Sequence, residues 1–404
     1  MDSWKIPWSG KAHDFTDEEI SFIVNVMKTA DPLTQGKYLK LFEEELTRYL
    51  GADTGSVCAL NSATSALELV AAFCGLKEGD EVIVPGHTFT ASALPFLRRG
   101  ARIIWADIDP LTWVISADDV INKITKRTKA IVLVHLYGVT ADVGKFIKIG
   151  ADKKILIVED AAQAFGAMHA GKRAGTLADF GVFSFHAQKN MTTFGEGGAL
   201  YVKDAGIAAK VPGMRNFGAK PFDKKEFYWK PAMTNIDTVL DNELPYKFTI
   251  SEIQCAIGYK LLKRIESLNN SRKARYLEFR KALSAFPELV FQKVPDGCEP
   301  SYHLLPAKYE GRKHGIASTR DDLIKALAFE YKVQAIVQYY PLYRYDLYKK
   351  CGQGKAECPN TDNLFDNMVS FPFHQWMSDE DFGYMVNSTK KALMKLRGQK
   401  NDKV

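Results

Sequence analysis

The sequence of 404 residues lacks features that mark several classes of protein. No apolar run reaches the roughly 20 residues of a transmembrane helix, and the start of the chain has no apolar signal core. The six cysteines show neither C-x-x-C nor zinc-ligand spacing, so we expect reduced thiols and no metal site. Internal repeats and low-complexity blocks are missing too. These absences favour a soluble, cytoplasmic protein without a membrane partner.

The chain also lacks a large excess of either charge sign. The 54 basic and 48 acidic residues leave a net charge of +6, and no basic run is long enough to indicate nucleic acid binding. The Lys- and Arg-rich end, residues 390–403, is typical of a solvated helix face and a frayed tail. Hydrophobic residues make up 46% of the chain, which is ample for a sizeable core.

Strand-like and helical patterns alternate through the first two thirds of the chain, which predicts a mainly parallel sheet wrapped by helices. The remainder has an α+β pattern. We therefore expect an α/β fold with a large domain (residues 1–265) that includes an N-terminal helical segment, and a smaller C-terminal α+β domain (residues 266–404). The expected helices are 15–31, 37–50, 116–124, 259–284 and 319–330, and the expected strands include 56–60, 130–134 and 301–305. A strand that ends in a turn is expected over 333–342, and a long loop over 220–244.

One lysine stands in an unusual setting. The strand-like residues 180–185 end in a polar turn that holds Lys189, and the turn closes on the glycine-rich residues 195–198 before another apolar run. A lysine buried between two strands would have a lowered pKa and could serve as an amine nucleophile. An exposed surface hairpin is an equally good interpretation of this segment alone.

A second segment favours the nucleophile. Residues 155–164 read as a buried parallel strand that delivers Glu159 and Asp160 to its C-terminal end, where ligands of α/β sheets gather. A buried Asp needs a partner, and a protonated ring nitrogen would be one. Lysine for a Schiff base and aspartate for a pyridinium nitrogen form the pairing that pyridoxal 5′-phosphate (PLP) requires.

Three motifs then occur in a familiar order: Glu159-Asp160-Ala161-Ala162-Gln163, Ser184-Phe185-His186-Ala187-Gln188-Lys189-Asn190 and Gly195-Glu196-Gly197-Gly198. Together they resemble the DegT/DnrJ/EryC1/StrS family of PLP-dependent sugar aminotransferases, and the likeness runs from about residue 6 to about residue 396. The resemblance implies fold type I, with a sheet of the seven-stranded type in the large domain. It also implies a homodimer with sites at the subunit interface.

The resemblance assigns roles to particular residues. Lys189 would form the Schiff base, Asp160 would face the ring nitrogen, and Gln163 would lie near the 3-oxygen. The ring would stack on Phe89, and the phosphate would meet Ala63 and Thr64 amides and the Ser184 hydroxyl. Candidate substrate contacts are His186, Lys247 and Tyr340. The chain departs from the family at Ala63, where glycine is usual, and at Pro245, where an asparagine normally reaches the neighbouring subunit's phosphate; Asn242 or Lys247 are the candidate substitutes.

The implied reaction moves an amino group from an amino acid, L-glutamate or L-glutamine, to a keto-sugar, with PLP and pyridoxamine phosphate (PMP) as the two cofactor forms. A nucleotide-linked keto-deoxysugar is the leading substrate. Alternatives are an aminotransferase for a free sugar acid or cyclitol, a sugar 3-dehydratase in which His186 takes the place of the lysine, and a non-catalytic PLP-binding regulator. Lys220, Lys224, Lys225 and Lys230 are candidate phosphate contacts, although a solvated loop is the simpler interpretation.

Overall fold

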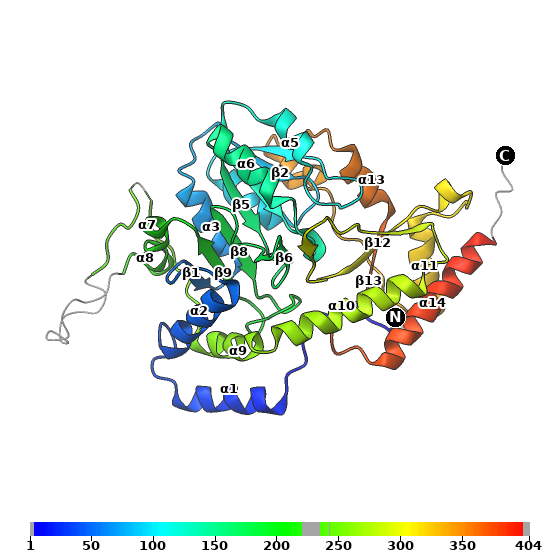
Figure 1. Cartoon of the computed structure of the whole chain (residues 1–404), viewed down its shortest axis with the longest axis horizontal. Helices are drawn as coiled ribbons and strands as arrows, with labels where there is room; N and C mark the ends of the chain where they lie inside the picture. The colour runs from blue at the N-terminus through cyan, green and yellow to red at the C-terminus, as the bar shows by residue number, and fades with distance from the viewer. Residues whose placement is uncertain (1–3, 220–234, 242, 399–404) are drawn as a thin grey trace.

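A seven-stranded sheet forms the centre of the computed structural model, which describes residues 4–219, 235–241 and 243–398 (Figure 1). The strand order is β1-β9-β8-β5-β4-β2-β3, in which β9 runs antiparallel to its neighbours and all other neighbouring pairs are parallel. The predicted, mainly parallel sheet is thus confirmed. The strands are β1 (Val57–Leu60), β2 (Glu81–Pro85), β3 (Arg102–Ala106), β4 (Thr128–Val134), β5 (Leu156–Asp160), β8 (Phe180–Ser184) and β9 (Gly198–Val202).

The strands read as nearly continuous apolar runs because helices cover both faces of the sheet. Successive side chains point to opposite faces, so Val57 and Ala59 join one core while Cys58 and Leu60 join the other. The helices of this part are α1 (Asp17–Thr29), α2 (Lys37–Leu50), α3 (Ala63–Phe73), α4 (Leu94–Arg98), α5 (Ala117–Lys123), α6 (Val143–Lys153), α7 (Ala205–Ala208), α8 (Val211–Arg215) and α9 (Glu252–Leu262).

Helices α2 and α9 pack on one side of the sheet, and α1 forms an outer layer below them in Figure 1. Helix α1 begins with a capping box, in which the Thr16 hydroxyl accepts from the Glu19 N–H and the Glu19 carboxylate accepts from the Thr16 N–H. The acidic first turn predicted for this helix is present and suits the positive end of the helix dipole.

The C-terminal part has its own core beside the sheet (Figure 1). Phe279, Leu323, Phe371 and Leu393 are fully buried in this core. Its elements are α10 (Ile265–Ala282), β10 (Leu289–Phe291), β12 (Leu305–Tyr309), α11 (Arg320–Tyr331), α12 (Asp346–Lys350), α13 (Pro359–Asn367), β13 (Met368–Phe371) and α14 (Asp379–Arg397), while β11 (Cys298–Glu299) pairs with the hairpin of β6 (Met168–His169) and β7 (Lys172–Arg173). The division at 265/266 falls at the first residue of α10 and stays a prediction.

Two predicted strands of the C-terminal part are wrong. Residues 301–304 precede β12, because the N–H groups of Ser301 and His303 donate to the carbonyls of Gly138 and Tyr137 across the chain instead of to a strand. The strand expected at the start of 333–342 is absent, since residues 333–341 are irregular apart from isolated bridges that pair Val333 with Ile6 and Ile336 with Ser370, and Leu342 begins a short 3-10 turn (Leu342–Arg344).

The structure also bears on the helix expected over 259–284 and the loop expected over 220–244. The helix expected over 259–284 is two helices, since α9 ends at Leu262 and α10 begins at Ile265. Of the loop expected at 220–244, residues 220–234 and 242 lie outside the described residues.

None of the helices in the described part of the chain combines the length and apolar character that a bilayer crossing requires. All six cysteines are free thiols.

Candidate active site

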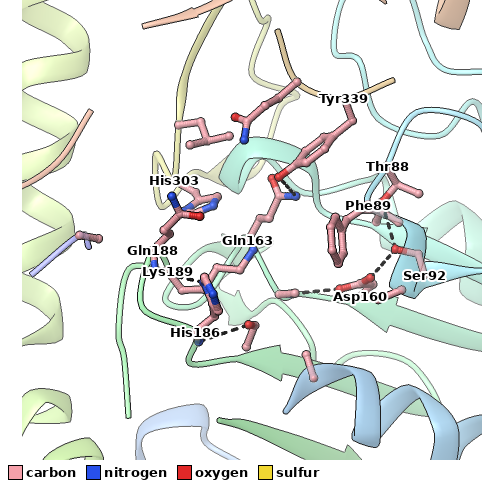
Figure 2. Close-up of a pocket in the computed structure, with 18 of the residues that line it drawn as sticks. Thr88, Phe89, Ser92, Asp160, Gln163, His186, Gln188, Lys189, His303 and Tyr339 are labelled. Atoms are coloured by element: carbon pink, nitrogen blue, oxygen red, sulfur yellow. Dashed lines mark hydrogen bonds between the residues drawn. The ribbon is translucent and has the colours of Figure 1, made fainter. Parts of the chain in front are cut away.

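A cavity of about 420 Å³ lies where β5 and β8 end and α3 begins (Figure 2). This is the carboxyl edge of the parallel strands, where ligands of α/β sheets bind. The cavity brings together positions up to 126 apart in the chain, from 63 to 189. Eight of the ten predicted site residues line it: Ala63, Thr64, Phe89, Asp160, Gln163, Ser184, His186 and Lys189.

Lys189 lies in the loop between β8 and β9 and turns its side chain into the cavity (Figure 2). Lys189 is half-buried, and desolvation of its amine lowers the pKa of Lys189 from 10.5 to about 8, against the opposing effect of the Asp160 carboxylate. The Lys189 N–H donates to the His186 carbonyl at 2.9 Å, which makes a tight turn. The buried nucleophile is therefore the better interpretation of this segment than the surface hairpin.

Asp160 ends β5 and is only 5% exposed. Its Oδ2 accepts a hydrogen bond from Ser92 Oγ at 2.7 Å, and its Oδ1 accepts from the Ala162 N–H at 3.1 Å. The Thr88 hydroxyl lies 3.0 Å from that of Ser92 and extends the chain of hydroxyls (Figure 2). These contacts orient the carboxylate at the edge of the cavity.

The Gln163 amide is oriented by two contacts. Its Oε1 accepts from the Tyr137 N–H at 2.9 Å. Its Nε2 donates to the Tyr339 hydroxyl at 3.3 Å (Figure 2). The amide has a second N–H on Nε2, so Gln163 can still donate to an oxygen in the cavity. The ring of Phe89 meets Tyr339 edge to face at 6.2 Å and is 55% exposed, so it offers the cavity an open aromatic surface.

The start of α3 lies beside Ser184. Its cap, Ser62, accepts from the Ser65 N–H at 3.0 Å, while the N–H groups of Ala63 and Thr64 belong to the first turn, where a helix offers no acceptor of its own. A Cβ built on Gly198 would lie 2.4 Å from Ala63 N, so the strand and the helix start are closely packed. Free amides at a helix N-terminus attract an anion such as a phosphate.

These features together fit PLP. An amine nucleophile, an oriented carboxylate, an aromatic face, an amide donor and a helix N-terminus surround one cavity, and each matches a different part of the cofactor. Lys189, Asp160, Phe89, Gln163 and the Ala63–Thr64 turn are the residues concerned.

Two predicted substrate residues lie outside the lining of this cavity. Lys247 donates to Asn216 Oδ1 at 3.1 Å and lies over the Phe217 ring. The ring of Tyr340 packs edge-on against Tyr345, and it is the preceding residue, Tyr339, that lines the cavity. Asn242 lies outside the described residues, as do the four lysines at 220, 224, 225 and 230.

Other lining residues were missed from the sequence. Ser92 follows Phe89 by three positions, but nothing in its local pattern marks it as a partner of Asp160. Tyr339 directly precedes Tyr340, the predicted substrate contact, so the prediction missed the lining tyrosine by one position. Six more lining residues come from irregular segments before α1 and after β13, which carry no periodic signal: Trp8, Ser9, Lys11, Ala12, Phe373 and His374.

Sheet order, the buried lysine and the oriented aspartate define the fold type I class of PLP enzymes. Comparison with known proteins narrows this class. Residues 14–390 match the DegT/DnrJ/EryC1/StrS aminotransferase family, so the chain belongs to this family of sugar aminotransferases. The family, fold class and enzyme class predicted from the sequence are confirmed.

Individual relatives agree with this assignment. The GDP-perosamine synthase of Caulobacter vibrioides is 32% identical over 76% of this chain and 78% of its own. The UDP-N-acetyl-3-dehydro-alpha-D-glucosamine 3-aminotransferase of Acidithiobacillus ferrooxidans is 28% identical over 93% and 94%. Spr1654 of Streptococcus pneumoniae, 28% identical, was solved in a PMP form (TM-score 0.85, covering 97% of this chain and 100% of that one) and a PLP form (0.84, 97% and 99%). These forms agree with the predicted cofactor.

Proposed function

We propose that the protein uses PLP to transfer an amino group from L-glutamate or L-glutamine to a nucleotide-linked keto-deoxysugar. The observation that carries the proposal is the convergence of Lys189 and Asp160 on one cavity at the carboxyl edge of the sheet. The relatives named for GDP- and UDP-linked sugars support the nucleotide-linked substrate. A free sugar acid or cyclitol is the alternative that the product analysis below distinguishes.

PLP, when bound, supplies an aldehyde that condenses with amines and a ring that withdraws electrons from the attached amino acid. The chain's own residues would hold it as the resemblance implies. Asp160, oriented by Ser92, would keep a proton on the ring nitrogen, and Gln163 would donate to the 3-oxygen. Phe89 would cover one face of the ring.

The phosphate end would be held by the start of α3. The Ala63 and Thr64 amides and the Ser184 hydroxyl, at the end of β8, are the donors that we assign to it. Ala63 keeps its backbone N–H although the family usually has glycine here, so the donor itself is retained. We also propose a homodimer, in which Lys247 would serve the partner's site. A cytoplasmic location stays a prediction.

Lys189 would bind the cofactor first and then act as the general acid–base of the reaction. With a pKa of about 8, its amine can carry a proton at Nζ and release it near neutral pH. His186 lies at the mouth of the same cavity, with its Nε2 3.9 Å from Glu196 Oε1, and we assign this pair to contacts with the sugar.

Product analysis tests the proposal. Purified protein is incubated with PLP, L-glutamate or L-glutamine, and a panel of nucleotide-linked keto-sugars, free keto-sugar acids and keto-cyclitols, and mass spectrometry detects any aminated product. Lys189→Ala should abolish the product and the visible absorbance of the bound cofactor, whereas His186→Ala should keep the absorbance. A wild-type protein that retains no B6 vitamer would contradict the proposal. Retention of PLP without any aminated product would favour the regulator, and loss of the absorbance in His186→Ala alone would favour the dehydratase.

A further inference from the structure

The N-terminal segment 5–13 joins the C-terminal part of the chain to the Lys189 loop. On one side, the Lys5 and Ile6 N–H groups both donate to the Lys332 carbonyl, and the Trp8 N–H donates to Gln334 Oε1 at 2.8 Å. Because the segment also lines the cavity, it lies next to the cofactor site without belonging to any helix or strand of the sheet.

On the other side, the segment contacts three consecutive residues of the loop. The Ala12 N–H donates to the Ala187 carbonyl at 2.9 Å, and Gln188 Nε2 donates to the Ser9 carbonyl at 2.9 Å. The third contact joins His13 Nε2 to the carbonyl oxygen of Lys189 itself at 2.8 Å. The main chain of the nucleophile is therefore held from a segment about 175 residues earlier.

The imidazole of His13 acts as a neutral donor. A carbonyl oxygen only accepts, so the proton lies on Nε2, and Nδ1 has no hydrogen-bond partner among the described residues. His13 is 1% exposed. Burial, with Arg272 and Arg264 nearby, lowers its pKa from 6.5 to about 4, although the bond to Lys189 and the charge of Glu19 act in the opposite direction. At neutral pH the ring is uncharged.

We propose that His13 is a positioning residue for Lys189, which acts by holding the carbonyl of residue 189 so that the amine points into the cavity. The proposal rests on the proposed function of Lys189. The His13 side chain is absent from the cavity lining and is not assigned a contact with substrate. Without its hydrogen bond the loop retains the Ala187 and Gln188 contacts, but the residue that carries the nucleophile loses its own anchor.

The test uses the PLP-loaded full chain and four variants. His13→Ala removes the donor, and His13→Gln places an amide N–H at a similar reach. His13→Asn keeps a polar side chain that is one bond too short, and it replaces His13→Ala if that variant does not fold. His314→Gln is the matched control, because His314 is exposed in the short helical turn Gly311–His314, outside the cavity lining.

The half-reaction with the amino donor alone is followed through the cofactor absorbance in stopped flow. We expect the rate at saturating donor to fall about 10- to 100-fold in His13→Ala and His13→Asn, since small misplacements of reacting groups have effects of this size. The donor concentration for half-maximal rate should stay within about threefold, since ground-state binding is not touched. His13→Gln should recover most of the rate, and His314→Gln should match the wild type.

Wild-type half-reaction rates in His13→Ala, or His13→Asn if it is used instead, would overturn the proposal. Equal losses in His13→Gln and His13→Ala would overturn it too, since they would indicate a general packing role. These outcomes differ from failure of the proposed function, in which the wild-type protein itself would neither retain PLP nor respond to any amino donor.

Discussion

Gly198→Ala should damage the phosphate end of the site, and the structure sets the size of the effect. Gly198 begins β9 and pairs with Leu60 on one side and Ser184 on the other, directly below the start of α3. An added Cβ would lie 2.4 Å from both Ala63 N and Ser62 C and 2.8 Å from Phe183 O. All three are backbone atoms, so no side chain can rotate away.

Ordinary contact begins at 3.4 Å, so the start of α3 and the strand must separate by about 1 Å. Overpacking of this kind costs about 1–3 kcal/mol. If the strain is relieved by moving the helix start, it appears as weaker PLP binding, and each 1.4 kcal/mol corresponds to about a tenfold change in affinity. If the packing is kept, the same free energy appears as lower stability.

Two measurements cover both outcomes: the PLP dissociation constant, from a titration of cofactor absorbance, and the thermal unfolding midpoint of the cofactor-free protein. Gly383→Ala is the matched control. Gly383 lies in α14 with nothing within 4 Å of its built Cβ, so alanine there should stabilise the helix by about 1 kcal/mol and leave PLP binding unchanged. Wild-type affinity together with wild-type stability in Gly198→Ala would refute the reasoning.

Three further predictions concern titration and orientation. In cofactor-free protein, labelling of Lys189 by an amine reagent, measured by peptide mass spectrometry, should rise with pH around a midpoint near 8. Asp160→Asn should lower this midpoint, because the Asp160 carboxylate raises the pKa of Lys189. A midpoint near 10.5 would contradict the argument that burial lowers this pKa. Because the folded state lowers the pKa of His13 from 6.5 to about 4, its contribution to stability is complete above pH 6.5 and is lost as pH falls towards 4, by at most about 3 kcal/mol. His13→Gln should flatten the pH dependence of the thermal unfolding midpoint between pH 6.5 and 4. An unchanged slope in this variant would contradict the linkage between His13 protonation and stability. Ser92→Ala removes a donor to the Asp160 carboxylate and should cost about 1–3 kcal/mol in stability or in PLP binding, whereas wild-type values for both would show that the contact is dispensable.

The sequence by itself determined the sheet and the positions at its edge of the two residues that we propose carry the chemistry. The strand that ends in Asp160 and the loop that holds Lys189 are local patterns: a buried apolar run makes a parallel strand, and its polar end must lie at the carboxyl edge. The place of Gln163, three residues beyond Asp160, follows from the same strand, whereas the role proposed for it comes from the resemblance to the family. Parallel neighbours with their ends at one edge bring these side chains together without further information.

Tertiary structure alone decided which side chains support that pair. Ser92 bonds Asp160 across 68 positions, Tyr339 meets Gln163 across 176, and His13 holds Lys189 across 176. The segments that carry Tyr339 and His13 are irregular, so their hydrogen bonds are made to distant parts of the chain rather than to neighbours three or four residues away. Hydrophobic periodicity in a sequence indicates which face of a helix or strand is buried. An irregular segment has no such periodicity, so the sequence does not predict its contacts.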